Sequence, residues 1–138
     1  MPRKGEHGFT LIEILVVLLI IVVLAAIAFP LFVNQRAKAQ DVEAKTAART
    51  ALGAIEVFHQ DHNTFAGADK NALIAIEPAL AEAHGLDVTA TATDFTITVD
   101  SVAGGNGGGP FKVQRTGTTT ERTCAVPGNG GCPNTGRW

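Results

Sequence analysis

Several residue types that define common classes of protein are scarce in this sequence. It has two cysteines, both within the last 15 residues, which are too few for a disulfide-dense scaffold or for a zinc site of four cysteines. The formal net charge of −2 argues against a nucleic-acid binder that relies on bulk positive charge. The single serine, Ser101, stands near a glycine run and is no convincing nucleophile. No lysine–serine or lysine–threonine pair follows that run, residues 104–109, so it is not a phosphate-binding loop.

Hydrophobic residues make up 46% of the 138 residues, but they are concentrated towards the N-terminus. Within residues 11–33, 21 of 23 are apolar, and residues 14–29 contain no polar side chain. This concentration rules out an ordinary soluble globule and also disorder throughout. About 20 apolar residues span the roughly 30 Å core of a bilayer as a helix. Arg3 and Lys4 precede the segment, and this basic flank predicts that the N-terminal end stays cytoplasmic.

A secretory signal peptide and a simple membrane anchor are alternative interpretations of this segment. The apolar run is longer than the usual signal core of about 7–15 residues, and no alanine-x-alanine exit follows it. Glu13 opposes the simple anchor, because an acid at the centre of a membrane helix costs roughly 2.5–3.5 kcal/mol. No lysine or arginine inside the segment can neutralise it. We therefore expect its partner to come from another chain or to be a freed N-terminal amine.

The residues around Glu13 form a motif. Residues 8–13, Gly-Phe-Thr-Leu-Ile-Glu, resemble the processing site of type IV prepilins and the related pseudopilins. The resemblance implies that residues 1–8 are a leader, that a prepilin peptidase cuts after Gly8, and that Phe9 becomes an N-methylated N-terminus. Pro30 falls where many pilins carry a helix-bending proline.

Cleavage after Gly8 would create an ammonium group on Phe9, with a reference pKa of about 7.7–8.0. Glu13 lies about 6 Å further along the helix axis, at 1.5 Å per residue. The Glu13 side chain of one subunit can therefore pair with the Phe9 amine of a neighbour that is shifted along a filament. In a core of low dielectric constant, such a pair sets register more than net stability.

Residues 34–62 are expected to continue residues 9–33, the membrane or filament-core helix, as an amphipathic helix. An apolar stripe recurs at steps of three and four residues and consists of Ala44, Ala48, Ala51, Ile55 and Phe58. The charged residues, Asp41 among them, lie mostly off this stripe. A long helix with one apolar side needs a cover, and we expect the remainder of the chain to supply it.

Residues 63–138 are predicted to form a small head. Asp69 is positioned to cap a short helix with Leu73, Ile76 and Leu80, bent or cut near Pro78. Alternating or threonine-rich sequence predicts three antiparallel strands, in residues 94–100, 111–115 and 118–126. The expected fold class is α+β, with a long N-terminal membrane-spanning helix whose C-terminal half packs against a small antiparallel sheet. This order is similar to a pilin.

Cys124 and Cys132 enclose seven residues rich in glycine. In an extracytoplasmic protein two such cysteines favour a disulfide, and the pair resembles the C-terminal loop of many pilins. Free thiols or a bound metal are the alternatives.

None of the other polar clusters in the sequence predicts catalysis or a cofactor. His59, Asp61 and His62 offer part of a metal site without an evident third ligand, at a helix end where histidine also favours the dipole. Three further residues form no convincing acid–base set, namely Glu77, Glu82 and His84. A small basic face for DNA is conceivable from Lys112, Arg115 and Arg122, although the acidic balance favours a solvated surface.

The sequence predicts a structural protein without enzymatic activity, cofactor or metal. The first hypothesis is a subunit of a type IV pilus, and the second is a pseudopilin of a type II secretion or competence system. The cysteine pair, and a tail without a calcium-like acidic cluster, favour the pilus. A membrane-anchored binding domain that never polymerises is the alternative of another class.

The family resemblance also implies the partners and the location. The partners would be identical and related subunits, the prepilin peptidase and the assembly platform. The chain would lie in the inner membrane before assembly, and in an extracellular filament or a periplasmic pseudopilus afterwards.

Overall fold

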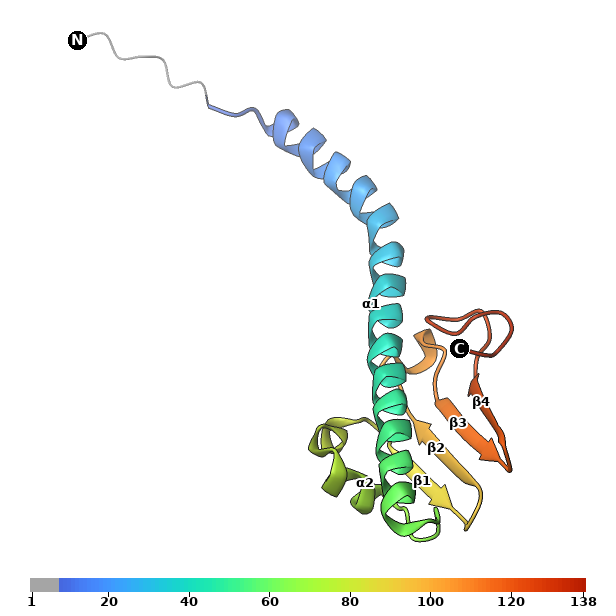
Figure 1. The fold of residues 1–138 in the computed structure, drawn as a ribbon. Coiled ribbons are helices and arrows are strands. Elements are labelled where there is room, and N and C mark those ends of the chain that lie inside the picture. Colours follow the sequence, from blue (N-terminus) through green and yellow to red (C-terminus); the bar gives the residue numbers. More distant parts are fainter. Residues whose placement is uncertain (1–7) are drawn as a thin grey trace, which may run out of the picture. The chain divides into compact units, whose positions relative to one another are not determined.

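A computed structural model describes residues 8–138 (Figure 1). All but the last residue of the expected leader, 1–8, lies outside this range. The chain divides into two compact units, one ending at Val33 and the other comprising Asn34–Trp138. Helix α1, Leu11–His62, contributes to both of them.

The first unit consists of the apolar part of α1 and the residues just before it. Its large side chains are exposed along the whole segment, for example Leu18 at 57% and Phe29 at 71%. By length and composition this part of α1 can cross a membrane, and none of its most apolar stretch is buried within the chain. Exposed apolar surface on this scale needs lipid or other protein to cover it.

In the second unit, the remainder of α1 buries one side. Ala44, Ala48, Ala51, Ile55 and Phe58 are all buried, so the structure confirms the predicted stripe. Small alanine side chains at four-residue and three-residue spacing let the sheet approach the helix backbone closely.

A four-stranded antiparallel sheet covers this stripe, with its strands in chain order. The strands are β1 Asp87–Ala90, β2 Phe95–Val99, β3 Phe111–Thr116 and β4 Thr119–Cys124. The three predicted strands are present, and β1 corrects the expectation that there are only three. Strand β1 has four residues, and its sequence, Asp-Val-Thr-Ala, carries one large apolar side chain. Its alternation is therefore too short to be read from the sequence.

The register of the sheet places the alternating residues as predicted. Ile97 pairs with Val113, and Val99 pairs with Phe111, with all four side chains on the buried face. The expected fold class, a long N-terminal helix with a small antiparallel sheet, is confirmed.

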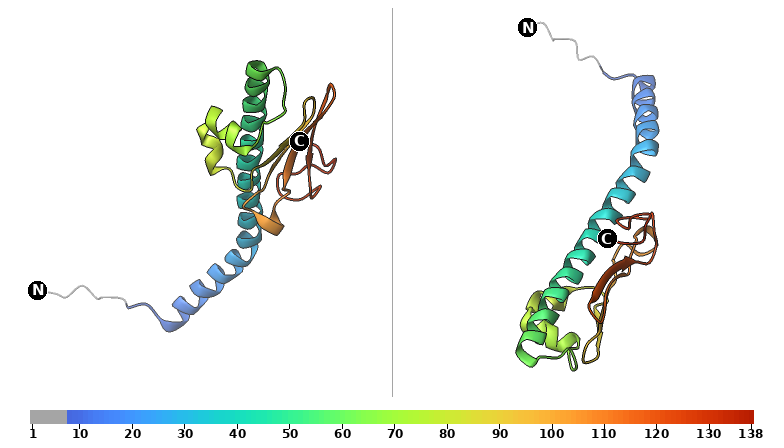
Figure 2. Two further views of the ribbon diagram at one scale, coloured as in Figure 1. Left: turned by 90° about the horizontal axis from the view of Figure 1, so that it is seen from below. Right: turned by 45° about the vertical axis from the view of Figure 1, so that its right-hand side comes forward.

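Two short helices follow α1 on the side away from β3 and β4 (Figure 1, Figure 2). Helix α2, Lys70–Ile76, begins at Asp69, whose side chain accepts a hydrogen bond from the Ala72 N–H at 2.8 Å, as the sequence predicts. The 3₁₀-helix η1, Pro78–Glu82, starts at the expected break. A second 3₁₀-helix, η2, occupies Gly104–Asn106 in the glycine run.

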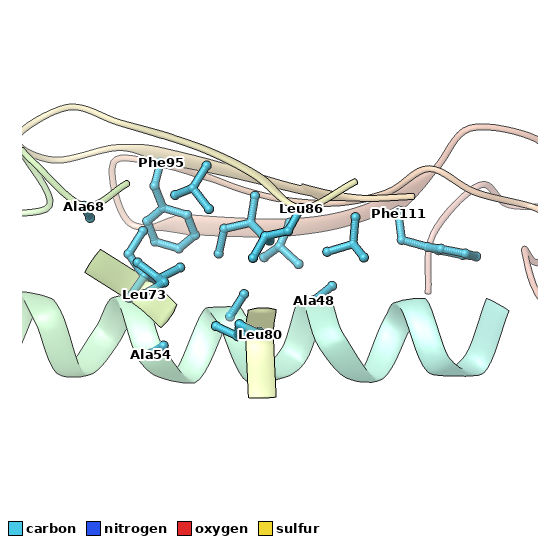
Figure 3. Close-up of a cluster of buried hydrophobic side chains, with 14 of the residues drawn as sticks. Ala48, Ala54, Ala68, Leu73, Leu80, Leu86, Phe95 and Phe111 are labelled. Carbon is cyan, nitrogen blue, oxygen red and sulfur yellow. The ribbon is translucent and has the colours of Figure 1, made fainter. Parts of the chain in front are cut away.

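The core of the head lies between α1 and the sheet, as Figure 3 shows. Leu73 and Leu80 from the short helices enter it, whereas Ile76 is 36% exposed and does not. Phe65 and Phe95 meet edge to face, with ring centroids 5.0 Å apart. Leu73 and Leu80 thus join the short helices to the core of the head.

Candidate assembly site

The motif residues lie at the start of α1. Thr10 immediately precedes the helix, and its hydroxyl accepts a hydrogen bond from the Glu13 N–H at 3.3 Å. In return, Glu13 Oε2 accepts from the Thr10 N–H and from the Thr10 hydroxyl, both at 3.4 Å. This is the reciprocal arrangement of a capping box, in which a threonine and a glutamate three residues apart satisfy the first free amides of a helix.

The capping box gives Glu13 a role within the chain that the sequence analysis missed. The signal was available in the sequence, because Thr10-Leu-Ile-Glu13 matches the pattern of a threonine followed by glutamate at the third position. In residues 8–138, no lysine, arginine or histidine lies within 4.0 Å of the Glu13 carboxylate. The cap satisfies backbone groups but leaves the negative charge without a counter-ion.

Gly8 and Phe9 precede the helix in an exposed segment without regular secondary structure. The Phe9 side chain is 77% exposed, and a Cβ added to Gly8 would meet no atom within 4 Å. Neither residue is therefore covered by the rest of the described chain.

Pro30 lies inside α1, which continues on both sides of it. Proline has no N–H, so the carbonyl of Ala26 lacks its usual helical hydrogen bond. Both positions fall in the stretch of α1 whose apolar side chains are exposed.

Cys124 and Cys132 form a disulfide with a Cα–Cα distance of 5.9 Å. The bond joins the last residue of β4 to the glycine-rich loop that follows. Both sulfur-bearing residues are buried in the core of the head.

Asp41 is the one charged side chain that is completely buried in the described residues. Ala37, Asp41, Ala44 and Ala48 are four, three and four residues apart, so Asp41 extends the buried stripe by one turn, which corrects the expectation that it lies off the stripe. Its Oδ2 atom accepts hydrogen bonds from the Gly108 and Gly131 N–H groups, each at 2.7 Å, while Oδ1 has no hydrogen-bond partner.

These bonds make Asp41 a clamp between three segments of the chain. Gly108 belongs to the glycine run and Gly131 to the disulfide loop, so one carboxylate fastens both to α1. Gly130 has a φ of 51°, and a Cβ there would overlap the Asp41 carboxylate, so this turn of the loop requires glycine.

Lys45, one turn after Asp41, completes this cluster. Its ammonium donates to the Gly131 carbonyl and lies 5.3 Å from the centre of the Phe111 ring. Burial lowers the pKa of Lys45 below its ordinary value, and the Asp41 carboxylate acts in the opposite direction. The sequence analysis missed the cluster because Gly108 and Gly131 lie 67 and 90 residues from Asp41.

The two histidines at the end of α1 contact aromatic rings. His62 stacks on Phe58 with ring centroids 4.1 Å apart, and His59 lies against Phe65 at 4.3 Å. In residues 8–138, no three potential metal ligands lie close enough together to hold an ion. Glu77, Glu82 and His84 are likewise not brought together by any hydrogen bond or ion pair that the described residues show.

The three strand cations do not form one basic face. Arg115 pairs with Glu56 at 3.2 Å and lies over the Phe65 ring. Val113 and Arg122 are partners in the register and therefore share one face of the sheet. Lys112 is next to Val113 along β3, so it lies on the other face. The alternation of the strands thus separates Lys112 from the two arginines.

The chain was compared with known proteins. A family model described as the prokaryotic N-terminal methylation motif matches residues 3–29. The type IV wide pilus major component PilA4 of Thermus thermophilus is 32% identical over 111 residues, which cover 76% of this chain and 78% of that protein. The fimbrial protein EcpC of Eikenella corrodens is 33% identical over 78% of this chain. The type IV major pilin protein PilA of Myxococcus xanthus is 36% identical over 70%.

The fold and the N-terminal motif therefore define a pilin-like protein, a long apolar helix that carries a small α+β head. The chain belongs to the type IV pilin family. It spans 62% of the length of the Eikenella relative and 42% of that of the Myxococcus relative.

Proposed function

We propose that this chain is a structural subunit of a type IV pilus, held in the inner membrane until it joins an extracellular filament. The observation that carries the proposal is the exposed apolar part of α1 with Glu13 in its first turn. A membrane can cover such a helix in the free subunit, and the helices of neighbouring subunits can cover it in a filament. The printed names of the relatives, which include major pilins and a wide pilus major component, support this choice.

In this proposal a prepilin peptidase cuts the exposed bond between Gly8 and Phe9, and Phe9 is then N-methylated. The new ammonium group supplies the counter-ion that the Glu13 carboxylate lacks. Because every subunit carries both groups, Glu13 of one copy pairs with Phe9 of the next and fixes the shift between their helices. Pro30 removes one backbone hydrogen bond from the part of α1 that packs in this filament core. The head has no catalytic role in this proposal.

The experiment is to shear surface filaments from cells that make this chain and from cells that lack it. We expect filaments in the first preparation, visible by electron microscopy, with this chain as their main protein. Filaments of unchanged number and composition in cells that lack the chain would contradict the proposal. Recovery of the chain only from membranes or from the periplasm would also contradict it, and the periplasmic result would favour a pseudopilin.

A further inference from the structure

Two differently charged surfaces of the head lie on the two sides of α1. At 3.6 residues per turn, Glu43 and Lys45 lie about 200° apart around the helix, on either side of the buried stripe. The side of Glu43 faces the short helix η1, and the side of Lys45 and Arg49 faces β4. In Figure 1 and Figure 2, α2 with η1 and the strands β3 and β4 lie on opposite sides of this part of α1.

The side near η1 is hollowed. A cavity of about 410 Å³ lies between α1, η1 and the end of β2, and it is open to solvent. We call it the acidic hollow. Its apolar wall includes Ala44, Ala47, Ala79, Leu80, Val99 and Val102, and its carboxylates are Glu43, Glu82 and Asp100. In residues 8–138, no cation lies within 4.0 Å of any of these three carboxylates.

The opposite side carries cations around one aromatic ring. The guanidinium groups of Arg49 and Arg122 lie 5.4 and 5.9 Å from the centre of the Trp138 ring, and both side chains are exposed. We call these three residues the basic flank. Neither arginine makes an ion pair within the described part of the chain, while the nearby Glu121 is paired with Arg137 at 3.0 Å.

We propose that the acidic hollow of one subunit receives the basic flank of a second copy of this chain. The inference rests on the proposed filament function. The two arginines of the basic flank have free hydrogen-bond donors, and they match the three carboxylates of the hollow, which have no cation near them. The apolar stems of the arginine side chains and the edge of the indole ring can contact the wall of alanine, leucine and valine. The two surfaces belong to different parts of the chain, so a copy that is bound through one surface still presents the other. A heterologous contact of this kind continues as an open helical array wherever its rotation does not close a ring, which is the symmetry that a filament requires.

Charge exchange tests this contact in cells that make filaments. One variant reverses the hollow, with Glu43→Arg and Glu82→Arg, and another reverses the flank, with Arg49→Glu and Arg122→Glu. We expect each variant to lower the yield of sheared filaments by roughly tenfold or more, because like charges then face each other. The variant with all four substitutions should recover most of the yield.

The controls reverse exposed charges outside both surfaces, with Asp61→Arg in one variant and Lys112→Glu in another. Lys112 is a close match for Arg122, because it lies on the neighbouring strand but on the other face of the sheet. Both controls should give normal filaments, and every variant should keep a normal amount of membrane-held, disulfide-bonded subunit.

Normal yield from either reversed surface, or no recovery in the fourfold variant, would overturn the contact and leave the proposed function standing. Filaments without this chain in the unmodified strain would instead overturn the proposed function, and this contact with it.

Discussion

Two acidic residues of α1 illustrate how context decides what a carboxylate does. Asp41 is fully buried, and both of its hydrogen bonds go to backbone N–H groups of distant loops. Glu13 belongs to the exposed apolar stretch, where it completes a helix cap and has no ion-pair partner among residues 8–138. The first residue holds the head together, and we assign the second to assembly.

Replacing Asp41 with alanine should destabilise the head by about 3 kcal/mol or more. The substitution leaves the Gly108 and Gly131 N–H groups without acceptors, and hydrogen bonds to a charged group contribute about 1.5–3 kcal/mol each. Denaturant unfolding of the full chain in detergent, followed by the fluorescence of the single tryptophan, measures the effect. Glu43→Ala on the exposed side of the same helix is the control, and equal unfolding midpoints for the two variants would refute the clamp.

Replacing Glu13 with alanine should abolish or strongly reduce filaments while the subunit still accumulates in the membrane. The substitution removes the cost of an acid in the membrane but leaves the proposed Phe9 ammonium of the neighbour unpaired. Breaking a buried ion pair in this way costs about 3–5 kcal/mol. Glu13→Gln keeps shape and hydrogen bonding and should be intermediate. The yield of sheared filaments, relative to membrane-held subunit, measures the effect.

Thr10→Val separates the assembly role of Glu13 from its capping role. The variant removes the hydroxyl that caps α1 but retains the acid, so filaments should still form. Loss of filaments from Thr10→Val and Glu13→Ala alike would show that the cap matters and not the charge. Normal filaments from Glu13→Ala would show that the acid has another purpose.

At the scale of elements, the glycine run and the disulfide loop have little regular structure of their own. The disulfide joins the loop to β4, the Asp41 clamp joins both segments to α1, and the Gly136 carbonyl accepts from the Cys124 N–H at 2.9 Å. The loop is therefore fastened both by a covalent bond and by hydrogen bonds to distant elements.

Alkylation of the surface protein without reductant should label neither Cys124 nor Cys132. Replacing both with serine should destabilise the head by about 2.5 kcal/mol on the chain-entropy model, without unfolding it, because the Asp41 clamp remains. Labelling of the native thiols, followed by denaturant unfolding of the serine variant, tests both statements. Quantitative labelling before reduction, or a serine variant that is already unfolded, would contradict them.

The elements that the sequence predicts well are those whose signal is local. Phe95, Ile97 and Val99 alternate without interruption, and Asp69 stands three residues before the Ala72 N–H that it caps. The clamp could not be predicted, because a glycine run and a glycine-rich loop give no sign of which distant carboxylate their amides will meet. The capping box could be predicted from Thr10 and Glu13. Because Glu13 lies in an apolar run, however, its charge was interpreted and its capping role was missed.

At the scale of the whole molecule, the chain combines a surface that needs partners with a head that is stable around its own core. The apolar part of α1 is exposed throughout, whereas the head buries three phenylalanines and a layer of leucine, isoleucine and valine side chains. These two parts suit a subunit that is stored in a membrane and then packed into a filament, and in the proposed function processing after Gly8 is the step between the two states.

The most direct test of the central claim is the intact mass of the protein in purified surface filaments. We predict a mass that corresponds to residues 9–138 with one added methyl group and with Cys124 and Cys132 oxidised. Fragmentation should place the methyl group on the Phe9 amine. Filaments that contain the chain with Met1 still in place, or filaments from which the chain is absent, would contradict the account.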